Sequence, residues 1–427
     1  MRFFRQKMFV LLCTVVFANF FAINASSQTV VPSNGHGFSF SPEWRIRNDE
    51  SNSAIVSTGN TAYNQEWISR LRLGFGWSDP SGLALFLQPQ YSWGNTTNSG
   101  HIAVVNDFDV FQGYAQGGKG RYQWRLGRQV LAFGDGRLIA SPEWNNYGRT
   151  FDAARFTFKS ARQTTDLFFG KIGFANGVTT VPTLYGVYRV EKFLPKLSSD
   201  LYALLKNDRV SGANLSVFTL GARPVIDLIP HTHITIEPAF QFGHFGGKAI
   251  GAWAYAAVAT YTFPGPSALH FVVEHDFASG GSPTDPAHYE TFDQLFPSTH
   301  GKSGILDYMG WRNMRHWHVG MGFAATKRLT LSVDGHFLSL ADGRDYWYGV
   351  NGAPVKGSSG KPLWSPTGAA GRDIGSEVDV VADYRVSAYL GLSIGYSHFW
   401  PGHYIKTLDP AQAHEVNWFY VQPTYRF

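Results

Sequence analysis

The sequence has 427 residues with a formal net charge of +5, and 16% of its residues are aromatic while only 16% are charged. No segment after the N-terminal region reaches the roughly 18 consecutive apolar residues of a membrane-spanning helix, and a single cysteine, Cys13, excludes both a disulfide framework and a thiolate metal site. A chain of this composition is either a large soluble β protein or an outer-membrane β-barrel.

The N-terminal region has the pattern of a secretory signal peptide. Basic residues precede an apolar core at residues 8–18, and small residues at 25–27 provide a cleavage site. Cys13 lies inside the apolar core without the small preceding residue that a lipoprotein signal requires, so no lipid anchor is expected. We therefore predict a signal peptide over residues 1–27 and a single domain over residues 28–427.

From there on, apolar and polar residues alternate with a period of two almost to the end of the chain, which predicts β-strands. In residues 66–77, Leu71 and Phe75 share one face while Arg70 and Arg72 share the other. Most of the predicted segments exceed the ~9–11 residues that a tilted strand needs to cross a bilayer. The eighteen segments are 38–48, 64–77, 83–94, 106–117, 121–133, 151–160, 163–175, 182–193, 200–207, 213–227, 231–244, 248–263, 267–279, 313–325, 328–341, 373–386, 388–400 and 414–427.

The connections between these segments differ in length according to side. The even-numbered connections are tight turns, whereas the odd-numbered ones include long stretches such as 280–312 and 342–372. Short turns on one side and long loops on the other are typical of outer-membrane barrels, and a soluble sandwich gives no reason for that alternation. We expect an all-β fold, a transmembrane antiparallel β-barrel of about 18 strands with short periplasmic turns and long extracellular loops.

If one face of each strand contacts lipid, the other lines a lumen wide enough for an aqueous channel unless loops plug it. The inward faces of the early strands are rich in arginine, whose planar guanidinium binds carboxylates and attracts anions. Acidic residues on later strands leave an alternative open, in which they pair with the arginines and only compensate buried charge. The predicted anion contacts on the early strands are Arg45, Arg47, Arg70, Arg72, Arg125 and Arg155.

Two blocks of sequence are distinctive. The first comprises LGRQ at 126–129, FGDGRLI at 133–139, WNN at 144–146 and RTFDAAR at 149–155. The second comprises TFDQLFP at 291–297 with His300, Gly304, Asp307 and Asn313. In order and spacing, both blocks resemble the alginate-export family of outer-membrane porins, and the resemblance spans nearly the whole mature chain.

The resemblance implies a monomeric eighteen-stranded barrel with an electropositive, arginine-rich constriction that passes an anionic polyuronate. Asp152 would be a structural partner of one arginine, and His300 and Asp307 would fix the long loop at 280–312. The acid-rich later strands, which also carry several histidines, depart from what a polyanion-specific pore would need. By motif, the anion contacts would be Arg128, Arg137, Arg149 and Arg155.

Arg128 breaks the alternation of its segment. A strict period of two directs it toward lipid, where a charge costs roughly 2–4 kcal/mol at the midplane. We expect either that a bulge at Gly127 turns Arg128 inward, or that the side chain lies close enough to the interface to reach it.

Other functions fit the sequence less well. A general diffusion porin for small nutrients shares every topological feature and differs in lumen charge and loop constriction. A barrel-embedded hydrolase could use His316, His318 and Ser332, but no local motif marks an activated serine. Those histidines could also bind a metal together with Asp334 and His336, although polar residues in a wet lumen need no such explanation.

We therefore expect a channel rather than an enzyme, located in the outer membrane of a Gram-negative cell. The expected cargo is an anionic solute, with an acidic polysaccharide such as alginate as the candidate. The expected partners are outer-membrane lipid, this cargo and periplasmic export components. We expect no cofactor, no metal and no nucleic acid, and a monomeric barrel.

Overall fold

The computed structural model describes residues 37–52, 65–98, 101–173 and 181–427, so the predicted signal peptide lies outside the described residues. In these ranges the chain is almost entirely β-structure, and none of its helices is long and apolar enough to cross a bilayer. The elements are β1 (Gly37–Ser51), β2 (Gln65–Ser78), β3 (Ala84–Asn98), β4 (His101–Lys119), β5 (Tyr122–Gln129), β6 (Phe151–Lys159), β7 (Gln163–Ile172), β8 (Thr183–Leu194), β9 (Leu197–Val210), β10 (Ala213–Ile226), β11 (Thr232–Phe245), β12 (Lys248–Thr262), β13 (His270–Ala278), β14 (His288–Tyr289), β15 (Met314–Ala324), β16 (Leu329–Leu340), β17 (Asp373–Arg385), β18 (Leu390–Pro401), α2 (His403–Leu408), η2 (Pro410–Gln412) and β19 (Val416–Arg426).

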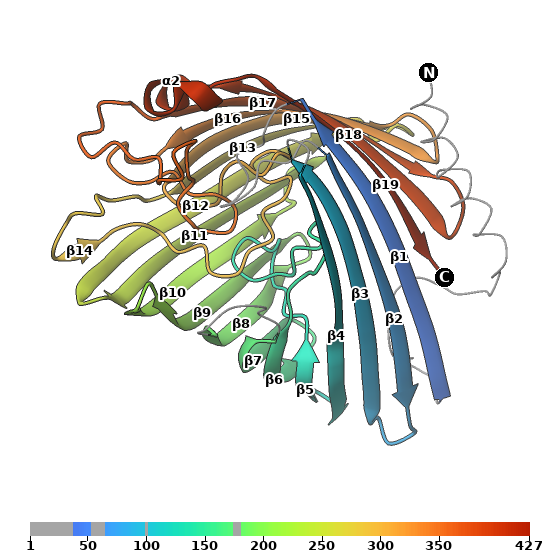
Figure 1. Cartoon of the computed structure of the whole chain (residues 1–427). Helices are drawn as coiled ribbons and strands as arrows, with labels where there is room; N and C mark the ends of the chain where they lie inside the picture. The colour runs from blue at the N-terminus through green and yellow to red at the C-terminus, as the bar shows by residue number, and fades with distance from the viewer. Residues whose placement is uncertain (1–36, 53–64, 99–100, 174–180) are drawn as a thin grey trace.

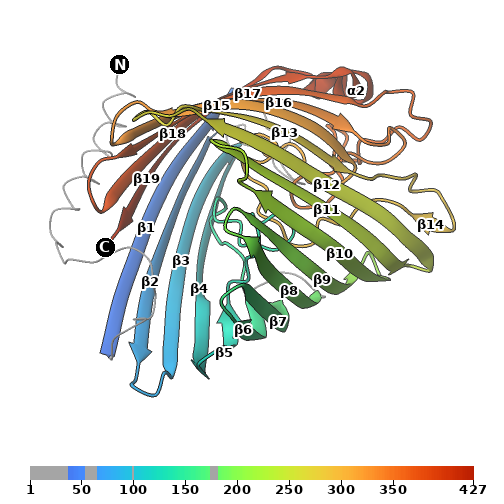
Figure 2. The same ribbon diagram turned by 180° about the vertical axis from the view of Figure 1, so that it is seen from behind.

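The strands form one closed barrel. Consecutive strands pair antiparallel, and β19 returns to pair antiparallel with β1, from Glu43 opposite Arg426 to Ser51 opposite Trp418. The described sheet has nineteen strands, but β14 is a two-residue strand in a loop that pairs parallel with β12, so eighteen strands make the wall. Figures 1 and 2 show the tilted strands as a ring. The predicted fold class is confirmed.

All eighteen predicted segments correspond to wall strands, with shifts at their ends. β4 begins at His101 rather than at 106, which extends its hairpin with β3. β5 ends at Gln129 rather than at 133, because the chain leaves the wall there and turns into the barrel. The sequence pattern did not predict β14, α2 or η2, which are short elements of loops without a lipid-facing side.

The outer surface is apolar and the inner surface carries the charges. Along β7, Leu167 and Phe169 are 53% and 51% exposed, while the alternate residues Asp166 and Phe168 are 4% and 1% exposed. The same alternation along other strands leaves large apolar side chains exposed outside and buries charged ones inside, as Arg70 illustrates on β2. A soluble protein would bury the first group and expose the second, so this arrangement indicates a barrel surrounded by lipid.

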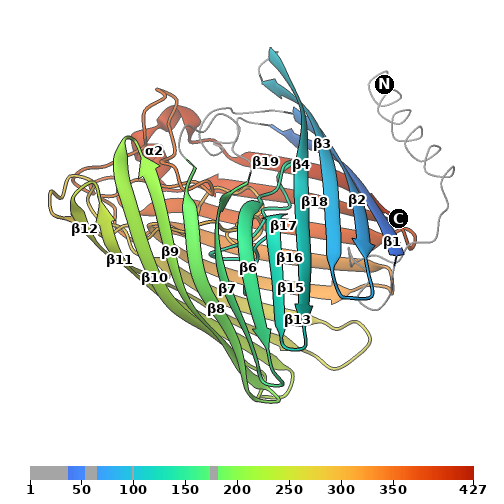
Figure 3. The same cartoon turned by 90° about the horizontal axis from the view of Figure 1, so that it is seen from below.

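Several loops fold inside the ring of strands. The loop between β5 and β6 (residues 130–150) and the loop between β13 and β15 (279–313) meet there, and Figures 1 and 3 show both within the barrel. A short parallel bridge pairs Ile139 with Phe296, and three backbone hydrogen bonds of 2.8–2.9 Å join the same segments. Apolar side chains from these loops and from 341–372 pack with inward residues of the wall in one buried cluster. The loops therefore form a core that narrows the lumen.

Candidate functional site

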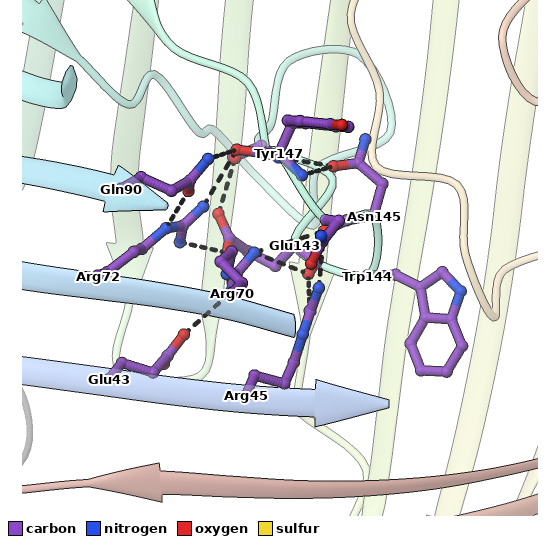
Figure 4. A network of polar contacts seen from close by, with 12 residues as sticks. Glu43, Arg45, Arg70, Arg72, Gln90, Glu143, Trp144, Asn145 and Tyr147 are labelled. Carbon is purple, nitrogen blue, oxygen red and sulfur yellow. Dashed lines mark hydrogen bonds and ion pairs between the residues drawn. The ribbon is translucent and has the colours of Figure 1, made fainter. Parts of the chain in front are cut away.

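The arginines of β1 hold the loop 130–150 through its backbone. Arg45 donates from Nη2 to the carbonyl of Asn145 (2.9 Å) and from Nη1 to the carbonyl of Glu143. Arg47 donates to the carbonyl of Trp144 (2.7 Å). Figure 4 shows Arg45 with these carbonyl groups. Charged donors thus satisfy three successive carbonyl groups that the loop would otherwise have to bury without partners.

The arginines of β2 bind the same loop through both side chain and backbone (Figure 4). Arg72 donates to the carboxylate of Glu143 (2.6 Å), and Arg70 lies 3.1 Å from the same oxygen. Arg72 also donates to Gln90 on β3, whose amide donates to the carbonyl of Tyr147 (3.1 Å). Burial disfavours the charge on Glu143, but the two guanidinium groups outweigh it and lower the pKa of this carboxyl.

These four arginines are therefore occupied by the protein itself. Arg45, Arg47, Arg70 and Arg72 are only 3–6% exposed. Their residue type and inward position predict anion contacts, whereas they lie beneath a loop whose carbonyl and carboxylate oxygens take the place of an anion. Their position makes them the anchor of the loop 130–150, which we call the arginine anchor.

Trp144, at the tip of this loop, connects it with the loop 279–313. Its ring stacks on His300 at 3.8 Å with an angle of 5° between the planes, and the guanidinium of Arg47 lies 3.7 Å from its centroid. His300 in turn lies 3.0 Å from Asp307 in its own loop. Tyr420 of β19 meets the indole edge-on. His300 and Asp307, which the resemblance assigned to fixing the loop, thus contact each other next to the stacking of Trp144 on His300.

Arg128 lies at the end of β5 between two carboxylates. Its Nε is 2.8 Å from Asp152 on β6, and its Nη1 is 3.1 Å from Asp109 on β4. The ladders on both sides of β5 run past Gly127 without a register shift, so the bulge that the sequence suggested is absent there. The charge is compensated by these two ion pairs instead.

Two more of the predicted arginines are also neutralised by acids. Arg155 binds Asp166 on β7 through two hydrogen bonds of 2.8 and 2.9 Å. Arg137 forms ion pairs with Glu274 and Asp276 on β13 and is 5% exposed. For Arg137, acids on a later strand therefore compensate the buried charge, as one of the two alternatives predicted. Its side chain links the loop 130–150 to β13 on the opposite wall.

Arg149 and Arg125 have no carboxylate partner among the described residues. Arg149 donates from Nη1 to the carbonyl groups of Ala140 (3.2 Å) and Pro297 (2.8 Å). Arg125 donates to the amide oxygen of Gln116 (2.7 Å) and lies over a tyrosine ring. Burial lowers the pKa of Arg149 to about 10, so its guanidinium remains cationic at neutral pH. Neutral oxygens orient these two guanidinium groups without cancelling their charge.

Several acids of the later strands have structural partners. Glu377 and Asp379 on β17 accept the backbone N–H groups of Leu306 (2.9 Å) and Ile305 (3.1 Å) and so hold the loop 279–313. The three histidines of β15 and β16 each lie beside a carboxylate. These pairs are His316 with Asp276 (3.1 Å), His318 with Asp334 (2.9 Å) and His336 with Asp379 (3.4 Å).

The geometry lends no support to the metal or hydrolase alternatives. In the ranges that the structure describes, no group of three or more His, Cys, Asp or Glu side chains is arranged to hold a metal ion. Ser332 lies opposite Gly322 in the ladder, whereas His318 lies opposite His336. The serine and the histidines therefore occupy different stretches of the β15–β16 pair.

Three residues that hold the loops in the barrel, Lys206, Asp293 and Glu143, do not stand out in the sequence as site residues. Lys206 on β9 binds Asp293 in the loop 279–313 at 2.9 Å, and both are buried. Glu143 completes the arginine anchor. Asp293 could have been singled out, because it lies inside the TFDQLFP block at 291–297. The alternation of β9 also places Lys206 on the inward face of the strand, together with Leu204. Nothing local showed that these residues meet.

The fold and the interior together define a class of protein. A closed barrel with an apolar outer surface, a charged inner wall and loops folded into the lumen is an outer-membrane channel of the porin type, located in a Gram-negative outer membrane. The chain belongs to the alginate-export family, whose profile, described as alginate export, matches residues 39–170 and 220–419. No curated protein matches it.

Solved structures show the same fold in Pseudomonas aeruginosa. The outer-membrane protein OprD is 12% identical with a TM-score of 0.59, and the similarity covers 94% of this chain and 97% of OprD. OccD3 (OpdP) is 12% identical with a TM-score of 0.60, covering 92% of this chain and 91% of that one. OccK11 (OpdR) is 12% identical with a TM-score of 0.57, covering 92% and 97%. At this identity the likeness establishes the fold alone.

Proposed function

We propose that this channel conducts anionic solutes in preference to cations, with an acidic polysaccharide such as alginate as its candidate cargo. The observation that carries the proposal is the uncompensated charge of Arg149 and Arg125. Arg128, Arg137 and Arg155 lie nearby in the chain but are paired with carboxylates. Membership of the alginate-export family supports the acidic character of the cargo.

We expect a solute to pass close to Arg149. It spans from the loop 130–150 to the carbonyl of Pro297 in the loop 279–313, and these two loops narrow the lumen. Its Nε and Nη2 have no protein acceptor within the described part of the chain and are not sealed from solvent. An anion passing through the channel can accept hydrogen bonds from such donors, because the protein orients them and leaves them open to water.

Selectivity in a planar bilayer tests the proposal. We expect the reversal potential under a KCl gradient to show anion preference in the wild-type barrel. In the double variant Arg125→Ala/Arg149→Ala, the anion-to-cation permeability ratio should fall about fivefold per charge, since a unit charge at ~8 Å in an intermediate dielectric contributes roughly 1 kcal/mol. The matched control is Lys327→Ala/Arg328→Ala, which removes the same number of charges from the exposed turn after β15.

Two outcomes would overturn the proposal. If the wild-type barrel is neutral or cation-selective, it is a general diffusion porin. If Lys327→Ala/Arg328→Ala lowers the ratio as much as Arg125→Ala/Arg149→Ala does, the selectivity does not arise at the loops. The cargo is tested separately by adding oligouronates and neutral oligosaccharides of equal length, and only the oligouronates should block the current.

A further inference from the structure

The periplasmic turns that follow β4, β6 and β8 lie at the lower edge of Figure 1, and they are rich in basic residues. The turns are adjacent, because Lys159 N–H donates to the carbonyl of Arg121 (2.9 Å) and Lys192 N–H donates to the carbonyl of Arg162 (2.8 Å). The six cations of this surface, which we call the basic rim, are Lys119, Arg121, Lys159, Arg162, Lys192 and Lys196.

Acidic groups do not balance the basic rim. Glu191 is the single carboxylate in turn residues 118–121, 159–163 and 191–197, and it forms an ion pair with Arg189 at 2.5 Å. Asp166, on the neighbouring β7, is buried inside the barrel with Arg155. Within the described residues, no ion pair involves any of the six cations. Such a surface attracts anions along the whole edge.

An apolar recess of about 600 Å³ opens on the outer wall directly beside these turns. Arg125 and Arg155 face the lumen, so their neighbours Trp124 and Phe156 face outward by alternation. Lys119 belongs to the basic rim and also lines the edge of the recess, where the apolar and basic surfaces meet. The apolar lining consists of Tyr122, Trp124, Phe156, Phe158 and Leu167.

Glycine shapes this recess. Gly117 of β4 lies opposite Trp124, and a Cβ at Gly117 would come within 2.9 Å of the indole. The indole can therefore approach β4 closely here, because residue 117 has no side chain. Gly118 follows in the lining with a φ of +156°. The Trp124 indole thus occupies the space that a side chain at residue 117 would take, and the recess opens beside it.

We propose that the basic rim and the recess together bind an anionic phospholipid of the periplasmic leaflet. The phosphate would contact the cations of the turns, and an acyl chain would occupy the recess, whose volume is in the range of small-molecule sites, about 300–1,000 Å³. An apolar hollow alone fits the chain of any lipid. The adjoining cations supply the preference for an anionic headgroup.

Native mass spectrometry of the full-length barrel tests this site. The detergent-solubilised protein is titrated with phosphatidylglycerol and with phosphatidylcholine of the same acyl chains. We expect phosphatidylglycerol to be retained preferentially, and the variant Lys119→Gln/Arg121→Gln/Lys159→Gln/Arg162→Gln to retain it at least about fivefold more weakly. Leu167→Trp, which fills the recess but keeps the cations, should also weaken retention.

The control is Lys327→Gln/Arg328→Gln/Arg385→Gln, which removes three charges from two other turns on the same edge. It should retain phosphatidylglycerol like the wild type, and heat-modifiable migration in gels confirms that each variant is folded. Equal retention of the two lipids, or equal loss in the control, overturns the proposal. Binding of polyglutamate without lipid retention would also overturn it and assign the rim to an acidic protein.

Discussion

Arg137→Ala is expected to destabilise the barrel interior by roughly 3–5 kcal/mol, the cost of leaving buried charges without their partner. Arg137 is buried and pairs with Glu274, Asp276 and Asp135. Burial opposes its charge, but Asp276 and Glu274 outweigh that effect and hold the pKa of Arg137 well above its usual value. Its removal would leave carboxylates facing one another and would detach the loop 130–150 from β13.

The measurement is thermal unfolding of the refolded barrel, followed by the loss of heat-modifiable migration. The matched control, Arg155→Ala, removes an arginine that has one carboxylate partner and is 25% exposed, so it should shift the midpoint much less. Arg137→Ala combined with Glu274→Gln and Asp276→Asn should recover much of the loss, because the uncompensated charges are gone. If the single variant unfolds like the wild type, Arg137 does not hold the interior together.

Arg70→Ala/Arg72→Ala is expected to release the loop 130–150 and to widen the channel. The two side chains bind the carboxylate of Glu143, and charge-assisted hydrogen bonds of this kind contribute about 1.5–3 kcal/mol each. We expect higher single-channel conductance with more current noise. Chymotrypsin should also cleave after Trp144 and Tyr147, which the native anchor protects.

Arg125→Ala is the control for this experiment, since Arg125 is a lumen arginine that binds Gln116 rather than the loop. It should alter ion selectivity while conductance noise and protease resistance remain as in the wild type. Unchanged conductance and protection in Arg70→Ala/Arg72→Ala would show that other contacts of the loop, such as those of Arg45 and Arg47, suffice to hold it.

Arg128, Arg137 and Arg155 are paired with carboxylates, and the other six predicted arginines fall into two groups. Arg45, Arg47, Arg70 and Arg72 bind the oxygens of a loop and set its position. We propose that Arg149 and Arg125 meet the solute. A guanidinium binds a carbonyl group of the protein as readily as an oxygen of a ligand, so residue type alone does not separate the two groups.

The sequence by itself determined the wall of the barrel. A strand that faces lipid on one side and a lumen on the other must alternate apolar and polar residues. This local rule predicted a strand at 373–386, and the structure has β17 at Asp373–Arg385. The same rule placed β12, predicted at 248–263, at Lys248–Thr262. The even number of strands predicted that the first and last strands pair to close the barrel, and the short turns predicted which end faces the periplasm.

Only the tertiary structure decided what fills the barrel. The ion pair of Arg137 with Glu274 joins residues 137 positions apart, and the partners of Arg45 and Arg47 are backbone carbonyl groups that every residue type possesses. No period or spacing in the sequence encodes such contacts. A strand faces lipid on one side and the lumen on the other, but a loop inside the barrel has no such regular surroundings. The position of each loop is therefore set by the buried charges and unpaired backbone groups for which it can provide partners.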